Sequence, residues 1–445
     1  MKRRLSVLLI TEGTYPGTIG GVSEWCHRLI NGMPDVDFKI VSISSSQSLP
    51  QTSQIPPNVS ELTFLPLWDK EERFIQFSQD SYFRKETLEF NSKLLYGTKS
   101  NYKWLNWVID GLEAETLFQK TLKKILSFPV PKANIINAMN SGLAGVLGLA
   151  GKRQHRVPLL ITEHGSYYKE WFLSARLGTC VSKERCWGTS LKNFGHSRAL
   201  LMQINRIVRS TIGGADLILP VATAHVPWEL YFGAQPERIT VIPNGVDTLK
   251  FRPREKENKD SIMIGSICRV TPIKDIQTLI FAAKRLLDQV PRAEFHLIGP
   301  IENIQYYLSC SEVIEDLGLE GRFLFHKATL EPEKWYNRFD LFALSSISEG
   351  MPLSILEAMA SGIPIVATDV GGLREVTRGT GTLVPTRQPK AFAKALQRGL
   401  QTNRRKKQKK SLLTRRMVKQ WFSEAQLIRK YMKIYISLLK GYKAN

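Results

Sequence analysis

The 445-residue sequence is short of cysteine, of acidic side chains and of long apolar runs, and each shortage excludes a class of protein. Its five cysteines are odd in number and scattered, and none lies in a C-x-x-C pair, so neither a disulfide framework nor a zinc site is indicated. No stretch approaches the ~18 apolar residues that a membrane-spanning helix needs. We therefore expect a cytoplasmic protein in a reducing compartment, with at most peripheral contact to a membrane.

The start of the chain imitates a secretory signal peptide without completing one. Met1–Arg4 carry positive charge, but the apolar run that follows, Leu5–Ile10, is only six residues long and meets Thr11 and Glu12. We predict that this segment is the first β-strand of the fold.

The shortage of acidic side chains is concentrated near the C-terminal end. The chain carries 62 Lys and Arg against 40 Asp and Glu, a formal net charge of +22. Residues Arg387–Lys443 hold 18 of the basic residues and a single acid, Glu424, so this segment alone accounts for +17. A basic tail of this kind suggests an anionic partner. Nucleic acid has little support as that partner, because the tail lacks interleaved exposed aromatic side chains.

Length and composition are those of a globular chain of two or three domains, with 43 % hydrophobic and 23 % charged residues. Short apolar runs bounded by glycine or proline recur, and each precedes a helical pattern, which predicts parallel strands with crossover helices. Two series of runs imply two doubly wound α/β sheets. The predicted strands are Ser6–Ile10, Phe38–Ile43, Ile135–Ala138, Leu159–Thr162, Leu217–Pro220 and Ile239–Ile242, then Ile262–Ile267, Glu294–Ile298, Phe323–Phe325, Leu341–Ala343, Ile365–Ala367 and Gly381–Val384.

A segment rich in Pro, Gly, Asn and charge, residues 243–260, separates the two series and reads as a linker. We place the boundary near Arg254, which gives an N-terminal domain over residues 1–254, a C-terminal domain over 255–418 and a basic terminal helix over 419–445. The first domain contains two long stretches without strand character, Asp69–Leu126 and Tyr167–Thr211. These are predicted as helical insertions that either shape a substrate surface or only add packing.

The tail divides into a charge run, Asn403–Lys410, and an amphipathic segment. Six apolar residues recur there at helical intervals while lysines and arginines occupy much of the remainder, which predicts one long amphipathic helix with a buried face and a basic face. The basic face either is solvated or holds the protein on an anionic membrane surface. The apolar six are Met417, Trp421, Ile428, Met432, Tyr435 and Leu439.

Two features of the first domain follow predicted strands. Gly20 and Gly21 stand after the first strand and before a helix, where glycine lets backbone N–H groups approach a phosphate closely. His164 follows the strand Leu159–Thr162 and would face the same cleft. Each has an ordinary alternative, because a tight turn explains paired glycines and a lone histidine is more often structural.

The second domain carries charged residues where its strands end. Arg269 and Lys274 lie at either end of the loop after its first strand, a pair able to neutralise a diphosphate. Their position at the carboxyl end of a strand favours a ligand-binding role, since ligands of open α/β sheets bind there. Two solvated surface cations are the alternative.

A pair of acids gives the strongest signal. Glu349 lies in a loop and Glu357 follows eight residues later, inside a helix that begins near Pro352. The free N–H groups at the start of that helix are able to donate hydrogen bonds to phosphate oxygens. Each carboxylate is able to accept hydrogen bonds from two adjacent hydroxyls, as in a ribose or a sugar. A solvated helix residue and a loop acid are the alternative.

With the linker sequence PNGVD, these motifs and their order resemble glycosyltransferase family 4, whose members are retaining, nucleotide-sugar-dependent enzymes. The most specific part is the acid pair in SEGMPLSILEAMASGIPIVATDVGG. More narrowly, LLITEGTYPGTIGGVSEW, TEHGSYYKEW and RVTPIKDIQTLI are similar to the PelF group of cytoplasmic exopolysaccharide glycosyltransferases. The Lys-Gly pair usual in the family is Lys274-Asp275 here, a departure that the PelF group shares.

The resemblance implies the GT-B fold, in which two Rossmann-like domains face a central cleft and a C-terminal helix crosses back to the first domain. It also implies four catalytic residues. Glu349 would contact hydroxyls of the donor sugar, His164 would approach the hexose across the cleft, and Arg269 and Lys274 would bind the diphosphate.

The remaining implied contacts bind the nucleotide sugar. Glu357 would contact the ribose, and Gly20 and Gly21 would let the first-domain loop close over the phosphates. Backbone amides near the start of the helix would hold the sugar and the phosphate; these belong to Gly350, Met351 and Leu353.

No metal and no resident cofactor are expected. The sequence has no Asp-x-Asp at a strand end, because Asp35-Val36-Asp37 lies in a connection. The donor implied is UDP-glucose, as co-substrate, and the acceptor is a growing exopolysaccharide or another glycan, within a polysaccharide synthesis and export complex. Alternatives are another donor, UDP-GlcNAc, UDP-GalNAc or a GDP-sugar, in lipopolysaccharide or glycolipid synthesis. A basic nucleic-acid-binding protein is the alternative from a different class.

Overall fold

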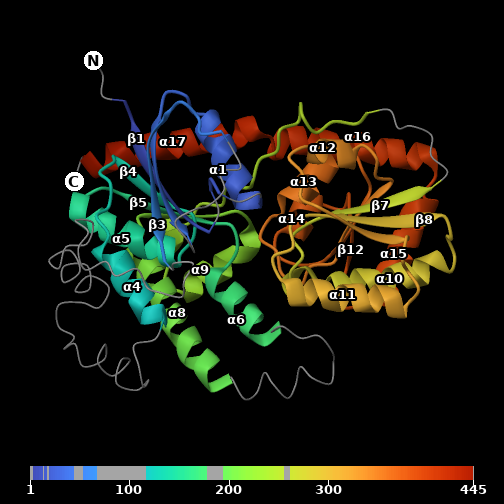
Figure 1. Ribbon diagram of the computed structural model, residues 1–445. Coiled ribbons are helices and arrows are strands. Elements are labelled where there is room, and N and C mark those ends of the chain that lie inside the picture. The colour runs from blue at the N-terminus through green and yellow to red at the C-terminus, as the bar shows by residue number, and fades with distance from the viewer. Residues whose placement is uncertain are drawn as a thin grey trace.

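The computed structural model describes residues 4–13, 15–17, 20–44, 54–67, 117–177, 194–254 and 261–443. Within them the chain forms two parallel six-stranded sheets, one in each half (Figure 1). The first sheet has the order β3-β2-β1-β4-β5-β6 and the second β12-β11-β10-β7-β8-β9. The strand order reverses between β1 and β4 and again between β7 and β10, and such switch points are where open α/β sheets bind ligands.

The strands of the first sheet are β1 (Ser6–Glu12), β2 (Asp37–Ser44), β3 (Val59–Pro66), β4 (Ile135–Ala138), β5 (Leu159–Glu163) and β6 (Leu217–Pro220). Those of the second are β7 (Ile262–Ile267), β8 (Ala293–Ile298), β9 (Phe323–His326), β10 (Leu341–Leu344), β11 (Ile365–Thr368) and β12 (Thr382–Val384). The central strands are buried along nearly their whole length, as expected of a parallel sheet with helices on both faces.

Helices cover both faces of the first sheet. They are α1 (Gly21–Asn31), α4 (Leu117–Ser127), α5 (Leu143–His155), α6 (Tyr167–Leu177), α8 (Phe194–Gly214) and α9 (Val226–Tyr231), with short 3₁₀ turns η1 (Thr223–His225) and η2 (Pro236–Arg238). Helix α5 packs closely on the sheet because its glycines leave room: a Cβ on Gly148 would lie 2.8 Å from Leu159 Cδ1.

The second sheet has its own set of helices. They are α10 (Ile276–Leu287), α11 (Ile304–Asp316), α12 (Pro332–Tyr336), α13 (Leu353–Ala360), α14 (Leu373–Thr377), α15 (Pro389–Gln401) and α16 (Arg404–Trp421), with the 3₁₀ turn η3 (Pro272–Lys274). Two apolar clusters, one on each face, make up its core: one includes α13 and the end of α16, and the other includes α10, α11 and α15.

Eleven of the twelve predicted strands are present, and one is wrong. Ile239–Ile242 runs beside β6 and makes only an isolated bridge, with Thr240 N–H donating to Ile218 O. A continued ladder would need an N–H from Pro220, which proline lacks. At the opposite edge the sheet has β3, which was not predicted because its residues alternate between polar and apolar and form no continuous apolar run.

The predicted insertions are helical where the structure describes them. Most of Asp69–Leu126 lies outside the described residues, and its end belongs to α4. The stretch Tyr167–Thr211 provides α6 and most of α8, with residues 178–193 outside the described part.

The predicted C-terminal helix that crosses back to the first half is present, but the prediction of one long helix from Met417 onward is wrong, because the tail forms two helices. Helix α16 lies on the second half and α17 (Glu424–Lys443) on the first (Figure 1). They meet at Phe422 and Ser423, where Val246 of the linker donates to Phe422 O and accepts from Glu424 N–H. The linker and the tail are thus hydrogen-bonded to each other at the point where the tail crosses between the halves.

The buried face also differs from the predicted stripe. Val418 and Phe422 are buried in the second half, and Leu427, Tyr431 and Tyr435 are buried against the first sheet. Ile428, Met432 and Leu439 lie beside them half-buried, whereas Trp421 is exposed beneath the guanidinium of Arg378. Across the described ranges, no helix combines the length and apolarity needed to cross a membrane.

Candidate active site

A cleft of about 880 Å³ lies between the two halves, at the carboxyl ends of β1, β5, β7 and β10. Every site residue predicted from the sequence lines it. From the first half come Gly20, Gly21 and His164; from the second come Arg269, Lys274, Glu349, Gly350, Met351, Leu353 and Glu357. The structure therefore brings together residues from four separate motifs, while their individual roles remain predictions.

Lys274 and Glu349 form an ion pair in this cleft. Lys274 Nζ lies 2.6 Å from Glu349 Oε1, and the hydroxyl of Ser346 donates to the same oxygen at 2.6 Å. Both side chains are largely buried, at 12 % and 8 % exposed. A fixed ammonium beside a fixed carboxylate offers one group to a phosphate and the other to sugar hydroxyls.

Asp275 occupies a turn whose backbone conformation favours glycine. Its backbone has φ 46° and ψ 50°, in the left-handed region that favours glycine and that aspartate tolerates better than most residues. Its side chain accepts a hydrogen bond from Thr278 Oγ1 at 2.7 Å, within the first turn of α10. The turn thus keeps its shape with a non-glycine residue, and the Lys274 side chain stays in the cleft.

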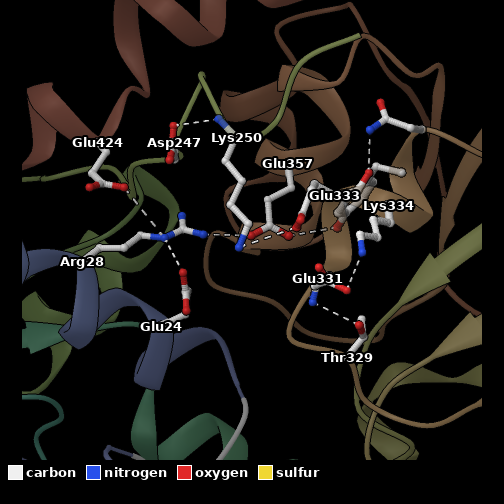
Figure 2. A network of polar contacts seen from close by, with 12 residues as sticks. Glu24, Arg28, Asp247, Lys250, Thr329, Glu331, Glu333, Lys334, Glu357 and Glu424 are labelled. Carbon is white, nitrogen blue, oxygen red and sulfur yellow. Dashed lines mark hydrogen bonds and ion pairs between the residues drawn. The ribbon is translucent and has the colours of Figure 1, made fainter. Parts of the chain in front are cut away.

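Glu357 is held by two neighbours. Its Oε1 accepts from Arg28 at 3.2 Å and its Oε2 from the hydroxyl of Tyr336 at 3.1 Å. Burial raises the pKa of this carboxyl, while Arg28 and the Tyr336 hydrogen bond act in the opposite direction. Arg28 comes from α1, in the other half of the molecule, so Glu357 is part of an interdomain contact (Figure 2).

The two halves touch where Gly350 meets His164. A Cβ on Gly350 would overlap the carbonyl oxygen of His164, so only glycine permits this approach. Behind the same loop, Gly372 N–H donates to Gly350 O at 2.8 Å, and a Cβ on Gly371 would overlap the carbonyl of Glu349. The loop that carries Glu349 is therefore fixed from both sides by close backbone contacts.

The His164 imidazole is neutral. Burial, with His225 nearby, lowers its pKa to about 4. Its ring stands edge-on to Trp25 at 4.9 Å, and its Nε2 is buried without a partner among the described residues. A neutral imidazole with an open hydrogen-bonding position suits a sugar hydroxyl better than a phosphate.

Two helix N-termini face each other across the cleft. Gly20 and Gly21 begin α1, and a Cβ on Gly21 would lie 4.0 Å from the side chain of Leu353, which begins α13. The linker residue Asn244 donates to Met351 O at 2.8 Å and so fixes the turn that leads into α13. First-turn amides lack partners within their helix, which makes this a suitable place for an anion.

Arg269 is less constrained than Lys274. Its guanidinium pairs with Glu302 at 2.7 Å, and both side chains are nearly half exposed. An exposed pair of this kind is weak, so Arg269 is able to exchange Glu302 for an anionic ligand at little cost.

Several lining residues were not predicted from the sequence. Glu12, at the end of β1, accepts from Tyr167 at 2.8 Å and from Asn140 at 3.1 Å. Its position after a strand was a usable signal, but Tyr167 and Asn140 come from separate segments. Arg28 lies inside α1 and gave no signal in the sequence. In the described part of the chain, no three His, Cys, Asp or Glu side chains gather as they would around a metal ion.

Two protein families match the chain in adjoining ranges. The family described as "Domain of unknown function (DUF3492)" matches residues 5–108 and 96–237, together more than half of the chain. The family described as "Glycosyl transferases group 1" matches residues 259–402. The first range includes Gly20, Gly21 and His164, and the second includes both acids of the pair.

Curated relatives align with part of the chain. D-inositol 3-phosphate glycosyltransferase of Nocardioides sp. is 31 % identical over 191 residues, 38 % of this chain and 42 % of that protein. The enzyme of the same name from Nocardia farcinica is 28 % identical over 271 residues, 57 % of this chain and 56 % of that protein. The chain spans about half the length of the curated relatives it matches.

Solved structures align over nearly the whole chain. Sucrose-phosphate synthase from Thermosynechococcus elongatus matches with TM-score 0.70 at 16 % identity, covering 98 % of this chain and 100 % of that one. Anabaena Alr3699/HepE in complex with UDP and glucose matches with TM-score 0.66 at 16 % identity, covering 97 % and 99 %. At such identity these similarities concern the fold alone, and they confirm the predicted GT-B architecture.

Proposed function

The chain belongs to the DUF3492 family and carries a glycosyltransferase group 1 domain, and from this premise we propose that it transfers a hexose from a nucleotide sugar to a glycan acceptor. The observation that carries the proposal is the meeting of Glu349, Glu357 and Lys274 with the N-terminus of α13 in one cleft. Hydroxyl-binding carboxylates beside phosphate-binding groups match the two ends of a sugar nucleotide.

The donor that we propose is UDP-glucose. Glu357 receives the ribose, Lys274 and Arg269 receive the diphosphate, and Glu349 with His164 receives the hexose hydroxyls. Support comes from the similarity to HepE, whose structure holds UDP and glucose, and from the resemblance to the PelF group. A GDP-sugar or an N-acetylated UDP-sugar is the alternative.

We propose a retaining reaction in which the chain's own cations stabilise the departing nucleotide. The bond between the sugar's anomeric carbon and the β-phosphate oxygen breaks, and the acceptor oxygen bonds to that carbon on the same face. The acceptor's proton passes to a β-phosphate oxygen, so the products are the glycoside and UDP. Lys274, Arg269 and the α13 amides stabilise the charge on the diphosphate, and no metal ion is required.

The acceptor that we propose is a growing polysaccharide. It enters along the first half of the cleft, where Glu12, Asn140, Tyr167 and Glu170 supply hydroxyl-binding groups. An acceptor for lipopolysaccharide or glycolipid synthesis is the alternative.

We also propose that the enzyme works at the cytoplasmic surface of an anionic membrane. Helix α16 has nine basic residues and no acidic one. Leu412 and Leu413, 72 % and 57 % exposed, project between the exposed Lys409 and Arg416. Cations around exposed leucines suit an anionic lipid surface, each cation contributing about 1 kcal/mol.

The catalytic proposal is tested with a panel of nucleotide sugars, scored by thermal shift and by nucleotide release in EDTA. We expect UDP-glucose to stabilise the protein most and to release UDP slowly, and Glu357→Ala to abolish both effects. Preferential stabilisation by a GDP-sugar would overturn the donor, and stabilisation by no nucleotide sugar would overturn the function.

The membrane proposal is tested by vesicle sedimentation. Wild type should sediment with vesicles containing acidic lipid but not with neutral ones, and the variant with Leu412→Ser and Leu413→Ser should sediment less. Equal, negligible binding to both kinds of vesicle removes the membrane role.

A further inference from the structure

Arg28 contacts several segments at the junction of the two halves. Its side chain is 7 % exposed and reaches three carboxylates (Figure 2): Glu24 at 2.9 Å, Glu357 at 3.2 Å and Glu424 at 3.9 Å. Its Nη1 also donates to the carbonyl of Gly245 at 3.2 Å. An arginine so placed uses its planar fork in several directions at once, which lysine is unable to do.

Two of these partners belong to the linker and the tail, the described segments that cross between the halves, and a third belongs to the second half. Gly245 lies in the linker, Glu424 begins α17, and Glu357 lies in α13 of the second half. The linker and the tail are joined to each other beside Arg28, because a Cβ on Gly245 would lie only 2.9 Å from Glu424 Cα. The guanidinium is therefore fixed by Gly245 of the linker and Glu424 at the start of α17, here called the hinge segments, as well as by Glu24 of its own helix.

The contact leaves Glu357 able to bind a ligand. A carboxylate has about four acceptor positions, and Arg28 and Tyr336 occupy one on each oxygen. Both oxygens therefore keep a position for the adjacent hydroxyls of a ribose. The two protein donors determine the direction in which those free positions point.

We propose that Arg28 is a positioning residue for the nucleotide: it orients Glu357 toward the ribose and makes that orientation depend on the hinge segments that hold Arg28. The inference rests on the proposed function, since it needs a nucleoside in the cleft. Arg28 acts through Glu357 and does not itself bind the phosphates.

Glu424 makes it possible to distinguish the positioning of Glu357 from a direct contact between Arg28 and the nucleotide. It reaches Arg28 from α17 and is not among the residues that line the cleft, whereas Arg28 and Glu357 line it. A loss of nucleotide affinity on changing Glu424 therefore has to pass through Arg28 or the hinge.

The test measures the affinity of UDP and of uridine by calorimetry in wild type, Arg28→Gln, Arg28→Lys, Glu424→Gln and the double variant Arg28→Gln with Glu424→Gln. Arg28→Gln should weaken both ligands by the same factor, about 10- to 100-fold, because the lost contact concerns the ribose carboxylate. Arg28→Lys should restore part of the affinity. Glu424→Gln should weaken both ligands less and should add nothing to Arg28→Gln, as expected of residues that act in one network.

The control is Arg374→Gln, which removes an arginine paired with Asp369 on the surface outside the cleft. Melting temperatures show whether each variant is folded. If Arg28→Gln does not fold, Arg28→Lys and Glu424→Gln still test the proposal. Weakening of UDP but not uridine would mean that Arg28 binds the phosphates and would overturn the inference. So would unchanged affinity in the folded variants. Failure of wild type to bind UDP or uridine would overturn the proposed function with it.

Discussion

The ammonium of Lys274 lies 2.6 Å from the carboxylate of Glu349, and the two side chains come from neighbouring loops at the ends of β7 and β10. Both are largely buried. Each charge therefore depends on the other until a ligand enters, and a donor that carries both phosphate and hydroxyls provides a new partner for each. Under the proposed function, the pair offers one partner to the phosphates and one to the hydroxyls of a sugar nucleotide.

Changing Lys274→Ala should lower turnover of the nucleotide sugar by about 100-fold or more, because a cation fixed at the leaving group is lost. It should also lower the free energy of unfolding by about 1 to 3 kcal/mol, because among the described residues Glu349 then keeps Ser346 alone as a side-chain hydrogen-bond partner. Steady-state kinetics and denaturant unfolding measure the two effects. Lys284→Ala, an exposed lysine on α10, is the control, and equal activity in the two variants would contradict the role of Lys274.

Changing Gly350→Ala should separate the two halves where Gly350 meets His164, because the added Cβ meets the carbonyl of His164. We expect loss of activity and of UDP-induced thermal stabilisation. Gly213→Ala is the matched control, since a Cβ there has nothing within 4 Å and alanine suits a helix. An active Gly350→Ala enzyme would show that this approach is not needed.

The pH dependence of stability should report the neutral state of His164. Burial and His225 lower its pKa to about 4, whereas an unfolded histidine titrates near 6.5. The unfolded chain then binds the proton first, so stability is present above about pH 6.5 and is lost as pH falls toward 4. His164→Asn should reduce this loss by up to about 3 kcal/mol. Denaturant unfolding at pH 7 and pH 4.5 measures the fall in the free energy of unfolding, with His155→Asn as the control. A fall as large in His164→Asn as in wild type would contradict the neutral state of His164.

A second pH effect concerns two buried acids behind the cleft. Burial raises the pKa of Glu229 to about 8, and burial together with Glu229 raises that of Glu163 well above its usual range. A carboxyl whose pKa is higher in the folded than in the unfolded chain contributes its full stabilisation at acidic pH. This contribution is lost as the pH rises through the folded pKa. Glu229→Gln should therefore flatten the fall in melting temperature between pH 6 and pH 8.5. Glu237→Gln, on the surface, should leave the fall in melting temperature unchanged. A fall as steep in Glu229→Gln as in wild type would contradict the raised pKa of Glu229.

The sequence predicted those features that depend on strand ends. His164, Arg269 and Glu349 each follow an apolar run, and parallel strands place their carboxyl ends at one edge of a sheet, so the convergence of these residues followed from topology. Apolar runs likewise located eleven strands, because buried parallel strands are almost continuously hydrophobic.

Features that depend on tertiary contact were not predictable in this way. Arg28 resembles any helical arginine until α13, α17 and the linker are placed around it. The break at Phe422 and Ser423 depends on hydrogen bonds to Val246 that no local pattern shows. For the same reason Trp421, apolar and at helical spacing, was assigned to a buried face although it is exposed.

The most direct test of the central claim is a proton NMR time course of UDP-α-glucose hydrolysis, with an equal amount of GDP-α-glucose present and EDTA added. Water then serves as a slow acceptor, so the anomer formed first reports the stereochemistry of transfer. We expect UDP-glucose to be consumed preferentially, α-glucose to appear first, and Glu349→Ala to stop the reaction. Preferential consumption of GDP-glucose, β-glucose as the first product, or hydrolysis that survives Glu349→Ala would contradict the proposed reaction.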